Sequence, residues 1–430
     1  MRSIFLGMLL VLTLQLNAQN SETVDWINEN SIKIEDADPD TELLEFKEKT
    51  PTKFANAKIF GFGEATHHGK EFFNIKAKFF KYLVETQGVR AFIMEEAYPA
   101  ESGINEWISG GKGDIQTIST NFTMQPWKTK EVVNLLEWMR NYNLDKPNEE
   151  QIRFYGMDIQ NVKDINQEIR DFVNKYNVPV NEKLLLIADS SANRQVDYKK
   201  STDWADIQIP KLKEIEQIIQ DFQADTGADQ NGEFKSVIRA LNYLIQYTYY
   251  VQHPESEVRD LKMFENVKWI IDNEALEGKA FIWAHNEHIN NKEMSYGSGW
   301  TSLGGHLKEY YKNDYYSVGF NFGTGKVIGL VTRRNKPNDW EVFEIDKPSR
   351  KSYAETLFEV NKDIFFIDMA AALNSDSRDF FSTTKKQLLL GAHGYSGKKR
   401  QLVNQNYSEM FDGLIFIKSI SVPNYDLKKE

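Results

Sequence analysis

The sequence contains no cysteine. This absence excludes disulfide bonds, a thiol nucleophile, an iron–sulfur cluster, a zinc site built on thiolates and a lipid anchor attached through cysteine. If the protein is an enzyme, its nucleophile must therefore be an oxygen or nitrogen atom of the chain, or an activated water molecule.

The chain also lacks a basic block and a repeating unit. Its 430 residues include 52 Lys+Arg against 63 Asp+Glu, a formal net charge of −11. There is thus no electrostatic footprint for a nucleic-acid backbone, and we expect no DNA or RNA partner. The absence of a fixed period excludes solenoids and propellers. Hydrophobic residues at 41% and charged residues at 27% exclude wholesale disorder, collagen and coiled coils.

The long apolar run of the chain is confined to its beginning. Residues 4–16 are almost uninterruptedly apolar, follow the positive Arg2, and end in a small residue at Ala18. This pattern is typical of a secretory signal peptide. The alternative, an uncleaved membrane anchor, needs about 20 apolar residues and this run is shorter. We expect a signal peptide over 1–18 and a periplasmic or secreted protein with no stable membrane anchor.

A strand followed by a helix and a second strand opens the mature chain. Residues 57–62 and 89–94 are short apolar runs. Between them, residues 70–85 place their bulky apolar side chains within an arc of roughly 140° on a helical wheel. The spacing of about 30 residues is that of a βαβ unit. It predicts two parallel neighbouring strands joined by a right-handed crossover.

Further apolar runs predict a larger sheet. Their continuous apolar character is typical of parallel strands covered on both faces. No comparable run occurs between about 164 and 278, where long helices such as 234–251 are predicted. We therefore expect one α/β hydrolytic domain over 19–430, a mostly parallel sheet with helices on both faces, and a large helical insertion over about 164–278 that could act as a lid. The further strands are predicted at 152–157, 280–284, 315–320, 363–367, 387–390 and 413–417.

Ionisable and polar side chains directly follow four of these predicted strands. Ligands of parallel α/β sheets bind beyond the carboxyl ends of the strands, so the four groups are expected at one edge. Any single one could be a solvated loop carboxylate or a core histidine, but the joint pattern favours a site. The groups are Glu64, His67 and His68 after the first strand, Glu95 and Glu96 after the second, Asp158 after the third, and His285, Asn286 and His288 after the fourth.

Lys76 lies in the middle of the apolar stripe of the 70–85 helix. A lysine that faces a core must extend its amine to water or pair with an acid, because an unpaired buried charge is costly. Its natural partners are Glu64 and Glu95, at the ends of the strands on which this helix is expected to pack. The alternative is a side chain that runs along the helix flank with its amine in water.

Several well-known sites are absent. Residues 61–66 lack the third glycine of the dinucleotide fingerprint, and Glu64 would place a negative charge where pyrophosphate binds. The segment 63–70 is wrongly spaced for a phosphate-binding P-loop. The chain has neither G-x-S-x-G, the nucleophile turn of α/β-hydrolases, nor H-E-x-x-H. Zinc or iron bound by His67, His285, His288 and a carboxylate stays open by ligand type, although the spacing is a weak metal signal.

Five short motifs occur along the chain: G-E-A-T-H at 63–67, I-M-E at 93–95, F-Y-G-M-D at 154–158, W-A-H-N at 283–286 and F-D-G-L-I at 411–415. In this order they resemble the erythromycin esterase family. The resemblance runs from about residue 40 to 422, nearly the whole mature chain.

The resemblance implies hydrolysis of the lactone ester of a macrolide without a required metal. It implies that His67 is the general base, that Glu64 and Glu95 support it, and that His285 is a second site histidine. The position of Lys76 is often arginine in the family. Lysine keeps the charge there but loses the bidentate fork of the guanidinium group.

Residues and resemblance together predict attack by water that neutral His67 deprotonates, since histidine titrates near working pH. Glu64 or Glu95 would fix its tautomer. His285, with Lys76 nearby, would stabilise the oxyanion or protonate the leaving alkoxide.

The remaining polar groups that follow the strands are predicted to bind the substrate, a small-molecule ester, and no metal or cofactor is expected. These groups are Glu96, Asp158, Asn286 and His288.

Three functions remain open from the sequence. The first is an exported hydrolase of a macrolide or similar lactone. The second is a hydrolase of an ester in a cell-envelope glycan or lipid; the aromatic content of 13% suits either substrate. The third is a haem- or metal-binding protein on a related fold, with His67 and His285 as ligands.

Overall fold

The structure, a computed structural model, describes residues 21–196, 203–227, 232–296, 299–395 and 402–426. It divides into two compact units. Unit 1 comprises Met1–Arg90, Thr129–Leu135 and Ala275–Glu430, and unit 2 comprises Ala91–Lys128 and Leu136–Glu274. The predicted signal peptide over 1–18 lies outside the described residues and stays a prediction.

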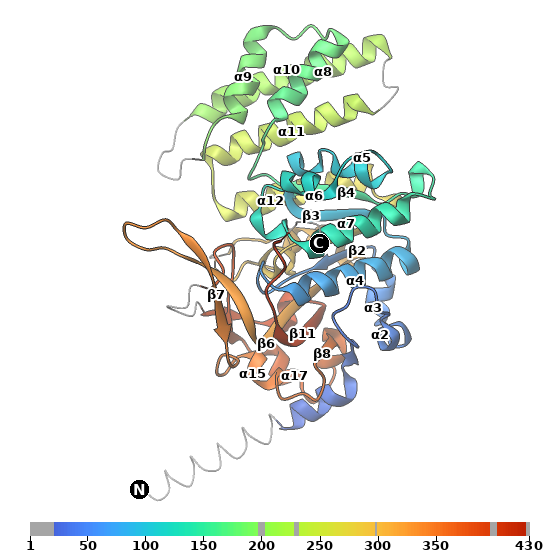
Figure 1. Cartoon of the computed structure of the whole chain (residues 1–430), viewed down its shortest axis with the longest axis vertical. Helices are drawn as coiled ribbons and strands as arrows, with labels where there is room; N and C mark the ends of the chain where they lie inside the picture. Colours follow the sequence, from blue (N-terminus) through green and yellow to red (C-terminus); the bar gives the residue numbers. More distant parts are fainter. Residues whose placement is uncertain (1–20, 197–202, 228–231, 297–298, 396–401, 427–430) are drawn as a thin grey trace, which may run out of the picture. The chain divides into compact units, whose positions relative to one another are not determined.

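Unit 1 is built on a sheet whose central strands are parallel (Figure 1). Its strands are β1 (Ile32–Lys33), β2 (Ile59–Phe62), β5 (Ala280–Trp283), β6 (Tyr315–Val331), β7 (Asp339–Ile345), β8 (Ile364–Asp368) and β11 (Gly413–Ile420). They are ordered β1-β8-β11-β6-β2-β5. β2 runs parallel to both β5 and β6, and β11 runs parallel to β6. The antiparallel pairs are β1 with β8, β8 with β11, and β7 with the second half of β6.

The main helix of unit 1 is α4 (Lys70–Gln87), and its predicted apolar stripe is buried. It ends at Gly88, whose φ of 73° lies in the left-handed region that favours glycine. The other helices of this unit are one over residues 21–30, α2 (Leu44–Glu48), α3 (Thr52–Asn56), η5 (Leu276–Gly278), α13 (Asn286–Ile289), α14 (Leu303–Tyr311), η6 (Lys312–Asp314), α15 (Tyr353–Leu357), α16 (Met369–Leu373), α17 (Arg378–Ser382) and α18 (Tyr407–Met410).

Unit 2 combines two parallel strands with a helical region. Strands β3 (Ala91–Ala97) and β4 (Arg153–Asp158) pair in parallel. The helical region contains α8 (Ile165–Tyr176), α9 (Glu182–Ala192), α10 (Trp204–Thr226), α11 (Glu233–Gln252) and α12 (Ser256–Asn273). Shorter helices are η1 (Tyr98–Glu101), α5 (Ile104–Ile108), α6 (Ile115–Ile118), η2 (Ser119–Asn121), η3 (Gln125–Trp127) and η4 (Asn148–Glu150); α7 (Lys130–Asn143) includes residues of both units.

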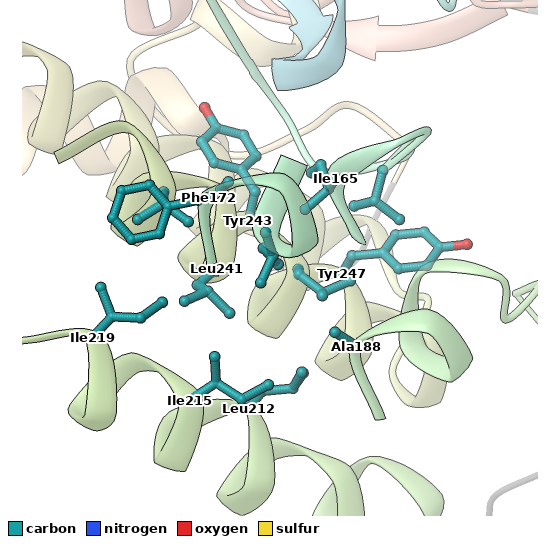
Figure 2. Packing of buried hydrophobic residues seen from close by; sticks show 14 of the residues in the cluster. Ile165, Phe172, Ala188, Leu212, Ile215, Ile219, Leu241, Tyr243 and Tyr247 are labelled. Carbon is teal, nitrogen blue, oxygen red and sulfur yellow. The ribbon is translucent and has the colours of Figure 1, made fainter. Parts of the chain in front are cut away.

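The helical region of unit 2 has its own hydrophobic core. Side chains such as Phe172 of α8, Ile215 of α10 and Leu241 of α11 belong to one buried cluster (Figure 2). Because each helix contributes an apolar face to this cluster, the region packs without a strand of its own. Among the described residues of the whole chain, no helix combines the length and apolar character that crossing a bilayer requires.

The predicted class is confirmed: the protein is an α/β protein with a mostly parallel sheet and a helical region from α8 to α12. The apolar runs at 57–62, 152–157, 280–284 and 413–417 form β2, β4, β5 and β11. The structure also contains β1, β7 and β10 (Leu402–Gln405), for which the apolar runs predicted no strand.

Two predicted details of the sheet are wrong. β2 and β3 are not neighbours, because β5 and β6 occupy the two hydrogen-bonding edges of β2. A connection through α4 can lead to a strand beyond the nearest one, and here β5, from far along the chain, pairs with β2 instead. The strand predicted at 387–390 is β9 (Lys385–Leu388), which pairs antiparallel with β10 in a separate two-stranded sheet.

Candidate active site

The turn that follows β2 is fixed to the neighbouring strand ends. The Gly63 N–H donates to the Val318 carbonyl of β6 at 2.9 Å, and the Asn286 N–H donates to the Glu64 carbonyl at 3.0 Å. A Cβ atom at Gly63 would lie 2.1 Å from Oδ1 of Asn286, so this close approach requires glycine. The turn therefore begins from a rigid edge of the sheet of unit 1.

Glu64 and His67 form the centre of the site. Nδ1 of His67 lies 2.6 Å from Oε1 of Glu64, whose side chain is completely buried. Because a carboxylate only accepts hydrogen bonds, the neutral imidazole carries its proton on Nδ1 and its lone pair on Nε2. The ring is thus arranged as a base whose tautomer is set by the acid.

Lys76 is the second partner of Glu64. Its Nζ lies 2.5 Å from Oε2 of Glu64, both side chains are 0% exposed, and Nζ lies 4.0 Å from the ring centre of Trp283. The sequence offered Glu64 and Glu95 as partners for Lys76. In unit 1, Lys76 forms an ion pair with Glu64. Each oxygen of Glu64 therefore contacts one nitrogen, so its charge is shared between a fixed cation and the imidazole ring.

His285 reaches the same site from the end of β5. Its ring centre lies 5.0 Å from that of His67, and its Nδ1 accepts the Glu287 N–H at 3.2 Å at the start of α13. A ring that accepts at Nδ1 carries its neutral-state proton on Nε2. The two histidines therefore hold opposite tautomers: His67 presents an acceptor at Nε2 and His285 presents a donor.

A buried acid supports the turn of His285. The Glu287 carboxylate accepts the Ser295 N–H at 2.6 Å and an N–H of the Gln405 amide at 2.7 Å, and burial raises its pKa. Glu287 stands in the polar group that follows the fourth predicted strand, but no sequence pattern assigned it a role of its own.

His68 has surroundings unlike those of His67. It is 2% exposed, its Nδ1 lies 2.6 Å from the Tyr425 hydroxyl, and its ring centre lies 5.2 Å from that of Trp340. Burial, and then the neighbouring His67, lowers the pKa of His68 to about 3, so its ring is neutral at working pH. Neither aromatic partner was predicted from the sequence.

Asn286 and His288 lie beside His285 on α13. The Asn286 amide donates to the Phe320 carbonyl at 2.7 Å and accepts the Phe320 N–H at 3.0 Å. Its side chain thus joins the end of β5 to β6, and substrate contact would require this bridge to open. His288 is buried, and its backbone N–H donates to the His285 carbonyl at 3.0 Å.

In unit 2, Glu95 and Asp158 are held together by Arg259 of α12. Nη2 of Arg259 lies 2.9 Å from Glu95 and 2.6 Å from Asp158. Burial alone would lower the pKa of Arg259, but the two carboxylates raise it well above its ordinary value. Sequence reasoning missed Arg259, because no local pattern distinguishes one arginine on a polar helix.

Glu96, next to Glu95 on β3, fixes a loop. Its carboxylate accepts the backbone N–H groups of Ala97, Thr123 and Met124 at 2.7 to 3.1 Å and also the Thr123 hydroxyl. Burial outweighs these bonds and raises the pKa of Glu96 to about 7. These contacts orient the 123–124 segment.

A metal site in this protein would need several His, Asp or Glu side chains close together. No group of three or more His, Asp or Glu side chains in that part of the chain is arranged to hold a metal ion. In the contacts above, the side chains of Glu64, His67 and His285 take part in hydrogen bonds with other residues of the chain.

Curated proteins of similar sequence include two hydrolases by name. A protein of Escherichia coli called erythromycin esterase type II is 23% identical over 385 residues, which cover 82% of this chain and 90% of that protein. A protein of Bacillus subtilis strain 168 called putative hydrolase YbfO is 20% identical over 429 residues, which cover 92% of this chain and 90% of that protein.

Solved structures share the fold along nearly their whole length. A Bacillus cereus protein superposes with a TM-score of 0.81 at 23% identity and covers 94% of this chain and 99% of its own. A succinoglycan biosynthesis protein has a TM-score of 0.77 at 20% identity, with 95% and 99% covered. A histidine-to-asparagine mutant of the erythromycin esterase EreC in its open conformation has a TM-score of 0.65 at 16% identity, with 93% and 99% covered.

The family itself is shown by a match over most of the chain. Residues 84–420 match the family model described as erythromycin esterase. The predicted resemblance is thereby confirmed, and the chain belongs to the erythromycin esterase family of hydrolases.

Proposed function

We propose that this protein is an exported hydrolase of a carboxylic ester, most specifically the lactone of a macrolide or a similar compound, and that it uses water activated by His67 without a metal. The observation that carries the proposal is the 2.6 Å contact between Nδ1 of His67 and the buried Glu64. This contact leaves Nε2 of a neutral ring as the base, which general base catalysis requires.

The reaction follows from the two histidine tautomers. Nε2 of His67 takes a proton from water while the water oxygen bonds to the carbonyl carbon, and Glu64 stabilises the imidazolium that forms. The Nε2–H of His285 donates to the developing oxyanion. When the carbon–oxygen bond of the ester breaks, the imidazolium of His67 returns its proton to the leaving alkoxide. The products are one carboxylate and one alcohol, which in a lactone belong to the same molecule.

The choice of substrate draws on the names of similar proteins. The relative from Escherichia coli is called an erythromycin esterase, which favours a macrolide lactone. A structural relative is called a succinoglycan biosynthesis protein. That name favours, as a second candidate, an ester carried by a cell-envelope glycan.

The substrate is tested by mass spectrometry. Purified protein is incubated with a panel of macrolides and, separately, with acylated glycan, and His67→Ala protein serves as the matched control. Addition of one water to a macrolide by the wild-type protein alone supports the first substrate. Release of a free acid from the glycan alone supports the second. If neither substrate changes, the proposed substrates are wrong.

Export is tested on protein from the native envelope. N-terminal sequencing is expected to begin near Gln19, because residues 4–16 have the length of a signal rather than an anchor. An intact Met1 in the cytoplasmic fraction would contradict this part of the proposal.

A further inference from the structure

The hairpin of β6 and β7 presents an exposed apolar face in unit 1. Trp340 is 43% exposed and Val342 is 55% exposed, and because they are two residues apart on β7 they point to the same side. Leu330 pairs with Trp340 and Ile328 pairs with Val342 across the ladder, so these two side chains share that side as well. We call these four residues the hairpin face; Figure 1 shows β7 extending from the sheet of unit 1.

The hairpin face begins beside the turn that carries the base. The ring centre of Trp340 lies 5.2 Å from that of His68, and His68 directly follows His67. A bridge between Thr66 and Leu390 and a hydrogen bond from the Leu330 N–H to the His393 carbonyl, 2.8 Å long, link this turn and the hairpin through one segment. The apolar surface and the reaction centre are thus parts of one continuous structure.

His68 lies against Trp340, the exposed tryptophan of this face, and carries a buried polar atom. Its side chain is almost completely buried, and within the described residues its Nε2 has no hydrogen-bond partner, whereas its Nδ1 is bound to Tyr425. A buried polar atom in this situation is costly unless a ligand or water bonds to it. The ring carries no charge at neutral pH, since its pKa is about 3.

The charged side chains of the hairpin lie on both of its sides. Arg333 pairs with Glu341, whose side chain points to the opposite side of β7 from Trp340. On the side of Trp340, Lys326 pairs with Glu344. This pair lies two positions along the ladder from the pair of Ile328 and Val342. The residue of this face that lies against His68, Trp340, and the three others that define the face are therefore apolar, and one pair of opposite charges lies further along the same side.

We propose that the hairpin face binds the apolar body of the ester substrate and that Nε2 of His68 bonds to a polar atom of the same molecule. The inference rests on the proposed function and adds the place where the substrate binds: an ester with an extended apolar surface lies against the hairpin face. Exposed apolar patches on soluble proteins commonly mark binding sites, and tryptophan contributes strongly to binding energy when it becomes covered.

The test combines binding with hydrolysis. Binding of octyl 4-nitrophenyl ether, which cannot be hydrolysed, is measured by calorimetry for the wild type, Trp340→Ala, Trp340→Phe and the control Tyr310→Ala. Tyr310 is an aromatic residue of α14 that is 55% exposed. We expect Trp340→Ala to weaken binding about tenfold, Trp340→Phe to retain most of it and Tyr310→Ala to match the wild type.

Hydrolysis of 4-nitrophenyl octanoate and 4-nitrophenyl acetate is compared in the same variants. The ratio of kcat/KM for the long ester to that for the short ester is expected to fall about tenfold in Trp340→Ala and to stay constant in Tyr310→Ala. The proposal that the hairpin face binds the substrate would be overturned if the wild type and Trp340→Ala bound the ether equally well. It would also be overturned if the wild type did not bind the ether. If the wild type hydrolyses neither these esters nor the macrolides and acylated glycan of the substrate test, but binds the ether through Trp340, the proposed function is wrong and the hairpin face remains a binding surface for apolar molecules.

Discussion

At the scale of single residues, the site depends on how one buried carboxylate is shared. Glu64 contacts His67 through one oxygen and Lys76 through the other, and its side chain and that of Lys76 are 0% exposed. The lysine lies over Trp283 and has no route along the helix surface to water. Its role is therefore to hold and neutralise Glu64, so that Glu64 can orient His67.

Replacement of Lys76 tests this arrangement. Lys76→Met conserves volume and helix propensity but leaves Glu64 buried without its cation. We expect the free energy of unfolding at neutral pH to fall by about 3 kcal/mol and kcat to fall strongly. The loss of stability should shrink in acid as Glu64 becomes protonated. Urea unfolding at neutral and acidic pH measures this; unchanged stability and unchanged kcat/KM would remove Lys76 from the site.

Sequence reasoning located the central residues and missed their supports. Glu64, His67 and His285 could be predicted because each directly follows an apolar strand, and Lys76 because a charge inside an apolar stripe is conspicuous. Arg259, Glu287, Trp340 and Tyr425 come from a polar helix, the short helix α13, an edge strand and the last described segment. Their contacts depend on tertiary packing, which no local period encodes.

At the scale of elements, the segment 421–425 near the C-terminus contacts the turn that carries His67 and His68 and the start of α4. The Lys70 N–H donates to the Ser421 carbonyl, and the N–H and hydroxyl of Ser421 both donate to Glu71 at 2.6 Å. Further along, the Tyr425 hydroxyl meets Nδ1 of His68. This segment thus contacts the last part of the turn, at His68, and the first residues of α4.

Tyr425→Phe isolates the last of these contacts. It removes one hydrogen bond to His68 and keeps the ring, so we expect the free energy of unfolding to fall by about 1 kcal/mol and kcat to fall less than tenfold. Ser408→Ala, a change on α18 remote from His68, serves as a control. The measurement is chemical denaturation together with ester hydrolysis. A loss of kcat as large as that caused by removal of His67 would show that Tyr425 takes part in the chemistry itself.

The element order illustrates what local patterns can and cannot predict. The stripe of α4 is encoded in its own 18 residues, and it was predicted correctly. The neighbours of β2 are β5 and β6, which lie more than 200 residues further along the chain and depend on how the whole sheet assembles. The prediction that β2 and β3 are neighbours rested on the short sequence separation between them, and it was wrong for this reason.

At the scale of the whole molecule, buried carboxyls make stability depend on pH. Burial raises the pKa of Glu96 and of Glu168 to about 7. Between the ordinary value near 4.5 and 7, the folded protein holds protons that the unfolded chain has released, so the free energy of unfolding falls as pH rises. We expect roughly 3 kcal/mol to be lost between about pH 5 and pH 8, after allowance for partial exposure.

Unfolding curves across this pH range measure the effect. Glu96→Gln and Glu168→Gln should each reduce the slope, because neither amide titrates. The control Glu149→Gln changes an exposed carboxylate and should leave the slope as it is. A free energy of unfolding that rises from about pH 5 to pH 8 in the wild type would contradict the raised pKa values.

At the same scale, the proposed mechanism predicts that activity does not depend on a bound metal ion. Activity is expected to survive EDTA, because the proposed mechanism assigns water activation to His67. The measurement is ester hydrolysis before and after chelation, with metal analysis of the protein. Reversible loss of activity that zinc restores would transfer this role from His67 to a bound cation.

The central claim is that His67, and not its neighbour, activates water. The most direct measurement is kcat of His67→Ala and His68→Ala, each shown to be folded by circular dichroism, on an ester that the wild-type protein hydrolyses. We predict a loss of about 100- to 1000-fold for His67→Ala and of less than tenfold for His68→Ala, because a ring with a pKa of about 3 is too weak a base to take a proton from water near pH 7. A wild-type kcat in His67→Ala, or a larger loss in His68→Ala, would contradict the account.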